Sequence, residues 1–133
     1  EKAFPGKWTV PGGEIEVLDY ALKNKDTKHH WYNVLESLLK KEIQEEVGLE
    51  IENIDYITSM VYIRPDNVPC LIISFFAEPK ESEVRLCKAL TKHAWIDLKE
   101  AKSYELIEGI YEELTILDNS LKTGKKLIWS RLK

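Results

Sequence analysis

Residues 39–49 read LKKEIQEEVGL, a stretch that places Glu42, Glu45 and Glu46 within five positions. Apolar residues recur around these glutamates at the i, i+3, i+4 spacing of an amphipathic helix. They are Leu35, Leu38, Leu39, Ile43 and Val47. Gly48 follows the last of them and suits the left-handed conformation that commonly ends a helix. The spacing therefore predicts a helix over about residues 32–47.

The three glutamates do not all fall on the solvent face of this helix. At about 100° per residue, Glu42 and Glu46 fall inside the apolar arc, and Glu45 falls at its margin. Two unit charges about 6 Å apart repel by roughly 3 kcal/mol at an effective dielectric of about 20, whereas exposed like charges on a helix cost far less. A solvated acidic face explains Glu45. For Glu42 and Glu46 it competes evenly with a divalent-metal site, and oxygen ligands favour Mg²⁺ or Mn²⁺ over zinc.

A loop upstream of the helix adds to the case for a metal site. Residues 11–13 read Pro-Gly-Gly and lead into Glu14-Ile15-Glu16. Glycine allows the backbone to approach another group closely because it carries no Cβ atom. A loop of this kind beside a carboxylate cluster could shape a pocket for a phosphate and a metal ion.

The stretches WTVPGGEIE (residues 8–16) and KKEIQEEVGL (residues 40–49) together resemble the Nudix box, Gly-x5-Glu-x7-Arg-Glu-U-x-Glu-Glu-x-Gly-U, where U is a bulky apolar residue. Gly13 matches the leading glycine. The closing half is matched in register by Glu42, Ile43, Glu45, Glu46, Gly48 and Leu49. The resemblance implies one domain over residues 1–133 of the α/β class, a Nudix-type α/β/α sandwich with a central mixed sheet. Because the family commonly has a strand or two before the position of Phe4, an N-terminal strand is expected to be missing.

The resemblance also implies a function. Nudix proteins typically hydrolyse a phosphoanhydride bond in a nucleoside diphosphate linked to another moiety. Glu42, Glu45 and Glu46 would be the catalytic residues and the ligands of Mg²⁺, with Mn²⁺ as the alternative ion. Gly12, Gly13 and Arg64 are the residues that we expect to contact substrate. The general base would be a box glutamate or an acid from a later loop, for which Glu100 and Glu105 are candidates.

Two positions depart from the Nudix pattern. Lys41 stands where the box has Arg, which keeps the charge but not the rigid guanidinium fork. Counting back from Lys41, the first Glu of the box falls on Asn33. The distance from Gly13 to Asn33 then contains 14 extra residues, which we assign to the polar segment of residues 19–30. The departures keep open a nucleotide-binding module without hydrolysis, and an enzyme that isomerises a diphosphate is a third reading.

The rest of the chain alternates strand and helix patterns. Residues 8–10 are expected to end a strand, and residues 14–18, 54–63, 69–78 and 93–98 are expected to form strands. Residues 64–67 predict a hairpin turn, and residues 104–117 predict a second amphipathic helix. Trp8, Trp31 and Trp95 could stack on a base, but we expect packing roles for them. His29 and His30 are expected to be solvated.

The composition of the chain limits the kinds of partner that we expect it to bind. The net charge of −4 makes nucleic acid an unlikely ligand. The two cysteines, Cys70 and Cys87, form no metal-ligand pattern, and we expect them to be reduced thiols of a cytoplasmic protein. No apolar run approaches 18 residues, so no membrane span is expected. The expected partner is a small-molecule nucleotide, and a homodimer would follow from the family resemblance.

Overall fold

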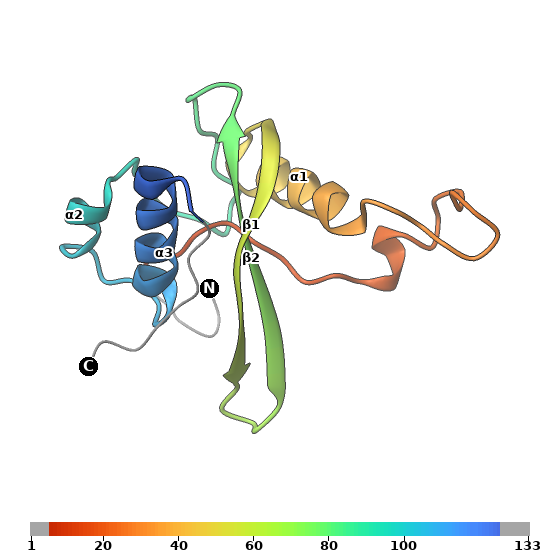
Figure 1. Ribbon diagram of the computed structural model, residues 1–133, viewed down its shortest axis with the longest axis horizontal. Coiled ribbons are helices and arrows are strands. Elements are labelled where there is room, and N and C mark those ends of the chain that lie inside the picture. Colours follow the sequence, from red (N-terminus) through yellow and green to blue (C-terminus); the bar gives the residue numbers. More distant parts are fainter. Residues whose placement is uncertain (1–5, 126–133) are drawn as a thin grey trace. The chain divides into compact units, whose positions relative to one another are not determined.

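The computed structural model describes residues 6–125 of the chain (Figure 1). Its elements, in order, are η1 (Val17–Asp19), α1 (Val34–Val47), β1 (Ile51–Ile63), β2 (Pro69–Pro79), α2 (Leu98–Ala101) and α3 (Ile110–Thr123). The described chain divides into two compact units. The helix unit comprises residues 10–52 and 78–93, and the hairpin unit comprises residues 6–9, 53–77 and 94–125.

The helix unit is organised around α1. Leu38, Val47 and Leu49 are buried on its apolar side. Gly48 ends the helix in the left-handed conformation, with φ 69°. The segment that returns after β2 satisfies two of the helix's last carbonyl groups: the Arg85 N–H donates to the Val47 carbonyl at 2.8 Å, and the Cys87 N–H donates to the Glu46 carbonyl at 3.0 Å. The C-terminal end of α1, which carries the glutamates, is therefore held by backbone hydrogen bonds.

The hairpin unit contains most of β1 and β2, which form a two-stranded antiparallel sheet (Figure 1). The turn is closed by a hydrogen bond from the Arg64 N–H to the Val68 carbonyl at 3.0 Å. In the same unit, Trp8 forms a parallel bridge with Leu106. The Trp8 ring also packs edge-on against Tyr104, with ring centroids 5.0 Å apart.

The principal elements agree with the sequence predictions. The helix predicted over residues 32–47 is confirmed as α1, and the two strands and the hairpin turn are confirmed as β1, β2 and their connection. The described chain is therefore a mixture of helices and antiparallel sheet. The α/β/α sandwich with a central mixed sheet stays a prediction.

Three local predictions were wrong. Residues 14–18 form no strand, because the Glu16 N–H donates to the Asp19 carboxylate at 2.6 Å and a 3₁₀ turn follows. Residues 93–98 form no strand, and Asp97 instead caps α2 by accepting a hydrogen bond from the Glu100 N–H at 2.8 Å. The second amphipathic helix begins at Ile110 rather than near residue 104, since the Ile107 N–H is used in pairing with the Trp8 carbonyl at 2.9 Å.

One buried acid in the hairpin unit gives this unit a pH-dependent stability. Glu113 of α3 is 7% exposed and accepts a hydrogen bond from the Ser74 hydroxyl of β2. Burial raises the pKa of the Glu113 carboxyl above its ordinary value of 4.5, against the opposing effect of the Ser74 hydrogen bond. The folded state then binds more protons than the unfolded state, so this contribution to stability falls as pH rises from about 4.5 through the folded-state pKa.

Glu113→Gln is therefore expected to raise the free energy of unfolding at pH 7 by on the order of 1 kcal/mol, because a neutral amide can still accept the Ser74 hydrogen bond. Below about pH 4 the two proteins should be equally stable, since the wild-type carboxyl is then protonated. Urea denaturation at both pH values measures this difference. Glu108→Gln, at an exposed position of the same unit, is the control. A loss of stability at pH 7 in the Glu113 variant would contradict the assignment.

Candidate functional site

The Pro-Gly-Gly loop lies directly against the α1 glutamates. The Gly12 N–H donates to Glu46 Oε2 at 3.2 Å, across 34 positions of sequence. A Cβ atom built on Gly13 would lie 2.4 Å from Glu42 Cδ and 2.8 Å from Glu42 Oε1. These contacts leave no room for a side chain at position 13 while Glu42 keeps its position. The structure thus brings together Gly12, Gly13, Glu42 and Glu46.

Glu42 lies in a negatively charged surrounding. Burial raises the pKa of its carboxyl above the ordinary value, and the negative charge of Glu45 raises it further. The positive charge of Lys41 acts in the opposite direction, and the more weakly acting Asp19 and Glu16 again raise the pKa. The carboxyls around Glu42 therefore repel one another, and a bound cation would relieve that repulsion.

Asp19 and Lys41 form an ion pair. Lys41 is the residue immediately before Glu42 in the sequence. Lys41 Nζ lies 2.7 Å from Asp19 Oδ1, and the Asp19 side chain is 7% exposed. The hydrogen bond from Lys41 lowers the pKa of the Asp19 carboxyl, with a further contribution from the Glu16 N–H. The same pair raises the pKa of the Lys41 ammonium. The Lys41 side chain is thus oriented by Asp19, which lies at the opposite end of the polar segment from α1.

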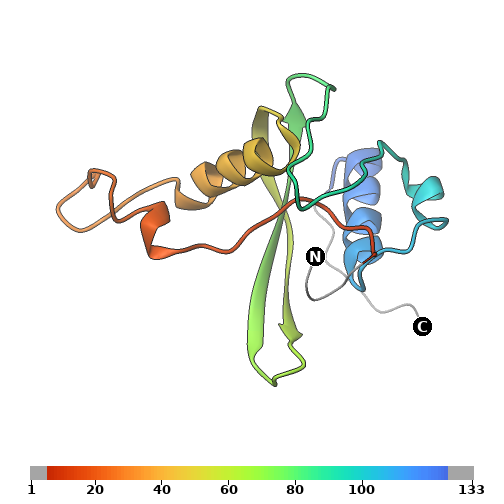
Figure 2. The same ribbon diagram turned by 180° about the vertical axis from the view of Figure 1, so that it is seen from behind.

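Asp19 was not among the residues predicted from the sequence. Counting forward from Gly13, Asp19 occupies the sixth position, where the Nudix pattern has its first Glu. Counting backward from Lys41 led to Asn33, which the structure places in a left-handed conformation at φ 55° before α1, with no capping hydrogen bond from its side chain. Counted forward from Gly13, the residues in excess of the Nudix pattern are residues 20–33, which we call the insertion, and the assignment of the extra residues to residues 19–30 stays a prediction. Figure 2 shows the insertion as a loop that extends beyond the N-terminal end of α1.

The remaining predicted residues do not take part in the contact between the glycine loop and α1. Glu45 is exposed on α1. Arg64 belongs to the hairpin unit, where its guanidinium pairs with the Asp66 carboxylate at 2.7 Å in the turn. Glu100 is part of the α2 cap, since its carboxylate accepts a hydrogen bond from the Asp97 N–H at 3.3 Å. Glu105 is an exposed residue of the hairpin unit whose backbone carbonyl accepts the Trp8 N–H at 2.8 Å.

The donor set around α1 suits a hard cation in its chemistry. Glu42 and Glu46 provide carboxylate oxygens against one glycine loop, and oxygen ligands are those that Mg²⁺ prefers. Within residues 6–125, however, no three His, Cys, Asp or Glu side chains converge closely enough to form a complete metal-binding group. Glu42 and Glu46 are therefore the residues that fit such an ion, and Glu45 is placed beside them on the same helix.

Comparisons with known proteins assign no family. A scan against models of protein families finds no match, and a search of curated proteins finds no relative. In the described part of the chain, every helix is too short or too polar to cross a membrane.

Asp19→Asn is expected to lower the rate of the reaction proposed below by about tenfold, as is typical when a residue that orients a site residue is lost. Circular dichroism should show that the fold is retained, and Lys41→Arg should keep most of the rate because Arg can also pair with Asp19. Asp118→Asn is the matched control, since Asp118 pairs with Lys122 on α3 at 2.8 Å. An undiminished rate in Asp19→Asn would show that the ion pair has no role in the reaction.

Proposed function

We propose that this protein is a Mg²⁺-dependent hydrolase of the Nudix type that cleaves a phosphoanhydride bond in a nucleoside diphosphate linked to another moiety. The observation that carries the proposal is the closure of the Gly12-Gly13 loop on Glu46 and Glu42. Gly12 and Glu46 are 34 positions apart in the sequence, and the glycine backbone of one part of the motif nevertheless contacts a carboxylate of the other part.

Each residue of the site has a role in this proposal. Glu42 and Glu46 would hold the ion, with Glu45 contributing to the same charge cluster. The ion, when bound, would neutralise phosphate charge and acidify a water molecule. The Gly12-Gly13 backbone would let a phosphate approach, because it presents no side chain at this point. Lys41, held by Asp19 at 2.7 Å, would add positive charge beside the glutamates.

A nucleotide-binding module without hydrolysis is the second candidate. It is favoured by the incomplete convergence of the carboxylates in residues 6–125. Asp19 weighs against it, because an acid at the sixth position after Gly13 would take the role that Asn33 cannot, and it pairs with the basic residue before Glu42. The balance of these observations supports the hydrolase.

The experiment that separates the candidates is a substrate panel. The purified chain is incubated with Mg²⁺ and a set of nucleoside diphosphates linked to sugars, nucleosides or alcohols, and phosphate release from the products is measured after phosphatase treatment. The proposal expects Mg²⁺-dependent cleavage of at least one class, abolished by chelation. Saturable binding with no turnover of any compound would support the binding module instead.

A further inference from the structure

The charge of the chain is unevenly distributed between the insertion and the rest. Residues 20–33 contain three lysines, Lys23, Lys25 and Lys28, and a single acid, Asp26, so the insertion carries a charge of +2 when its histidines are neutral. The whole chain carries −4, which leaves −6 on the remaining residues. The acidic net charge therefore describes the body of the protein and not the insertion, where a local positive field can attract an anionic partner.

The three lysines of the insertion are available to such a partner. Each of them is exposed. In the part of the chain that the structure describes, the ion pairs use other basic residues, namely Lys41, Arg64, Lys80 and Lys122. The charges of the insertion's lysines are therefore not neutralised by acids of the described chain.

The tip of the insertion is a closed turn that carries one of these lysines. The Asp26 N–H donates to the His30 carbonyl at 2.9 Å, and the Thr27 hydroxyl lies 2.8 Å from His30 Nδ1. Lys28 and His29 are the residues between these contacts, and both are exposed. The turn therefore presents Lys28 to solvent from a backbone that is held by its own hydrogen bonds.

The Trp31 ring organises the inner part of the insertion. Its indole N–H donates to the Lys23 carbonyl at 2.9 Å, and its ring packs edge-on against Tyr20 with centroids 5.1 Å apart. Lys25 Nζ lies 5.2 Å from the centre of the same ring. These contacts connect the beginning of the insertion with its end, so that Lys23 and Lys25 are held beside an aromatic side chain.

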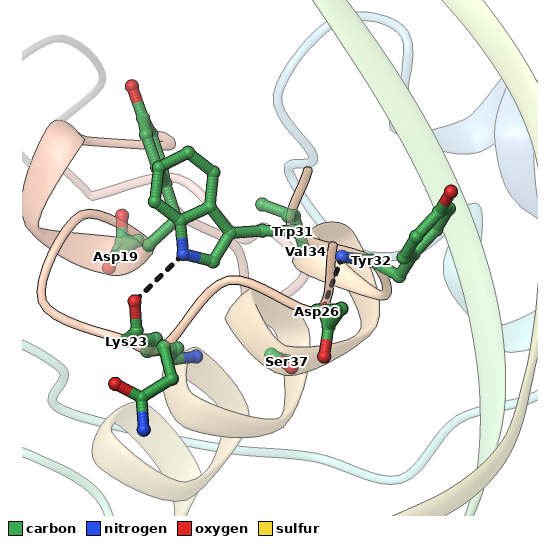
Figure 3. Close-up of a pocket in the computed structure, with 9 residues that line it drawn as sticks. Asp19, Lys23, Asp26, Trp31, Tyr32, Val34 and Ser37 are labelled. Atoms are coloured by element: carbon green, nitrogen blue, oxygen red, sulfur yellow. Dashed lines mark hydrogen bonds between the residues drawn. The ribbon is translucent and has the colours of Figure 1, made fainter. Parts of the chain in front are cut away.

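The neighbouring Tyr32 ring is left open to solvent. Tyr32 is 61% exposed, and Figure 3 shows its ring directed away from the Trp31 indole. The ring stacks with His30 at a centroid distance of 6.0 Å and an interplanar angle of 28°. The backbone beneath it is fixed, because the Tyr32 N–H donates to the Asp26 carboxylate at 2.8 Å. Tyr32 thus offers an exposed aromatic surface on the same short segment as the three lysines.

We propose that the insertion binds single-stranded nucleic acid, with Lys23, Lys25 and Lys28 at phosphates and a base stacked on the Tyr32 ring. Exposed lysines together with aromatic rings are the combination by which proteins bind single strands irrespective of sequence. An anionic membrane would also attract the lysines, but segments that lie in a membrane surface present an apolar face. The insertion has one large aliphatic residue, Leu22. The inference goes beyond the proposed function, because this binding needs neither a metal ion nor hydrolysis.

The test is fluorescence anisotropy of the full chain with an end-labelled oligouridylate of about 10 nucleotides, a length within the range that one single-strand-binding domain covers. EDTA is present throughout, so that metal-dependent cleavage does not interfere. Saturable binding is expected. With one phosphate at each lysine, the logarithm of the binding constant should fall with the logarithm of the salt concentration with a slope of about −2, which is a loss of about 20-fold between about 50 and 200 mM salt.

Substitutions separate the stacking contact from the charge. Tyr32→Ala should weaken binding by about tenfold, as is typical of losing one ring that stacks on a base, and Tyr32→Trp should retain it. Both variants keep the backbone N–H that contacts Asp26. Lys28→Gln should make the salt dependence shallower by about 0.7 in slope. Trp95→Ala and Lys99→Gln, at exposed positions of the hairpin unit, are the matched controls and should bind as wild type.

Several results would overturn this inference. The absence of saturable binding would do so, as would unaltered binding in Tyr32→Ala or an unaltered salt slope in Lys28→Gln. Binding to phosphatidylserine vesicles without binding to the oligouridylate would assign the insertion to a membrane surface instead. Circular dichroism checks that each variant folds. If Tyr32→Ala does not fold, Lys28→Gln and Tyr32→Trp still decide the matter, because the first changes only an exposed side chain and the second keeps an aromatic ring.

Discussion

Glu46→Gln is expected to reduce Mg²⁺-dependent hydrolysis by about 10²- to 10³-fold, the loss typical of removing one electrostatic contact to the reacting group. The amide oxygen of Gln can still accept the hydrogen bond that the Gly12 N–H now donates to Glu46 Oε2 at 3.2 Å. The loop should therefore stay in place while the negative charge disappears. Initial rates at saturating Mg²⁺, with the substrate found in the panel, measure the effect.

The control for this substitution is Glu50→Gln. Glu50 lies just beyond the same helix, and its exposed carboxylate forms only a 3.6 Å ion pair with Lys80, so the rate should be unchanged. Isothermal titration with Mn²⁺ gives a second readout, in which Glu46→Gln should bind the ion more weakly. A full rate in Glu46→Gln would remove Glu46 from the mechanism, and unaltered metal affinity would remove it from the metal site.

The sequence predicted the parts of the site that depend on local spacing. The helical period fixed α1 and hence the relation of Glu42 to Glu46, because side chains four positions apart share a helix face. Glycine composition correctly indicated a loop that other groups can approach closely. The contact between that loop and the glutamates followed from the combination of the two motifs, and the hydrogen bond from Gly12 to Glu46 agrees with it.

Other features could not be predicted in this way. The alternation of polar and apolar residues over 14–18 is compatible with a strand. The short-range hydrogen bond from the Glu16 N–H to the Asp19 carboxylate instead stabilises a turn there. Counting along the motif placed Asp19 or Asn33 at its first acidic position depending on the end used, and the 2.7 Å contact of Asp19 with Lys41 is visible only in the structure. The shape of the insertion arises from contacts such as that of Trp31 with the Lys23 carbonyl, which leave no periodic signal.

Gly13→Ala is expected to lower the rate of hydrolysis by about 10²-fold with little change in stability. The new Cβ atom would lie 2.4 Å from Glu42 Cδ, so the carboxylate must move. A misplacement of about 1 Å in a catalytic site can cost about 10²-fold in rate. The atoms that must yield belong to the end of a flexible side chain, and Gly13 does not have a positive φ, so the backbone can accept alanine. Rates and urea denaturation are measured together.

Gly12→Ala is the matched comparison, because a Cβ atom on Gly12 meets nothing within 4 Å and the N–H that contacts Glu46 is kept. Since the Gly12 backbone is itself proposed to face the phosphate, its loss of rate should appear in KM with kcat near that of wild type, whereas Gly13→Ala should lower kcat. A double-mutant cycle then identifies the cause of the Gly13 effect. In the Glu42→Gln background, whose rate is already low, Gly13→Ala should cost little more, since both changes remove the same positioned carboxylate. If the rate losses of Gly13→Ala and Glu42→Gln were fully additive, the effect of Gly13→Ala on the reaction would not act through the position of the Glu42 carboxylate.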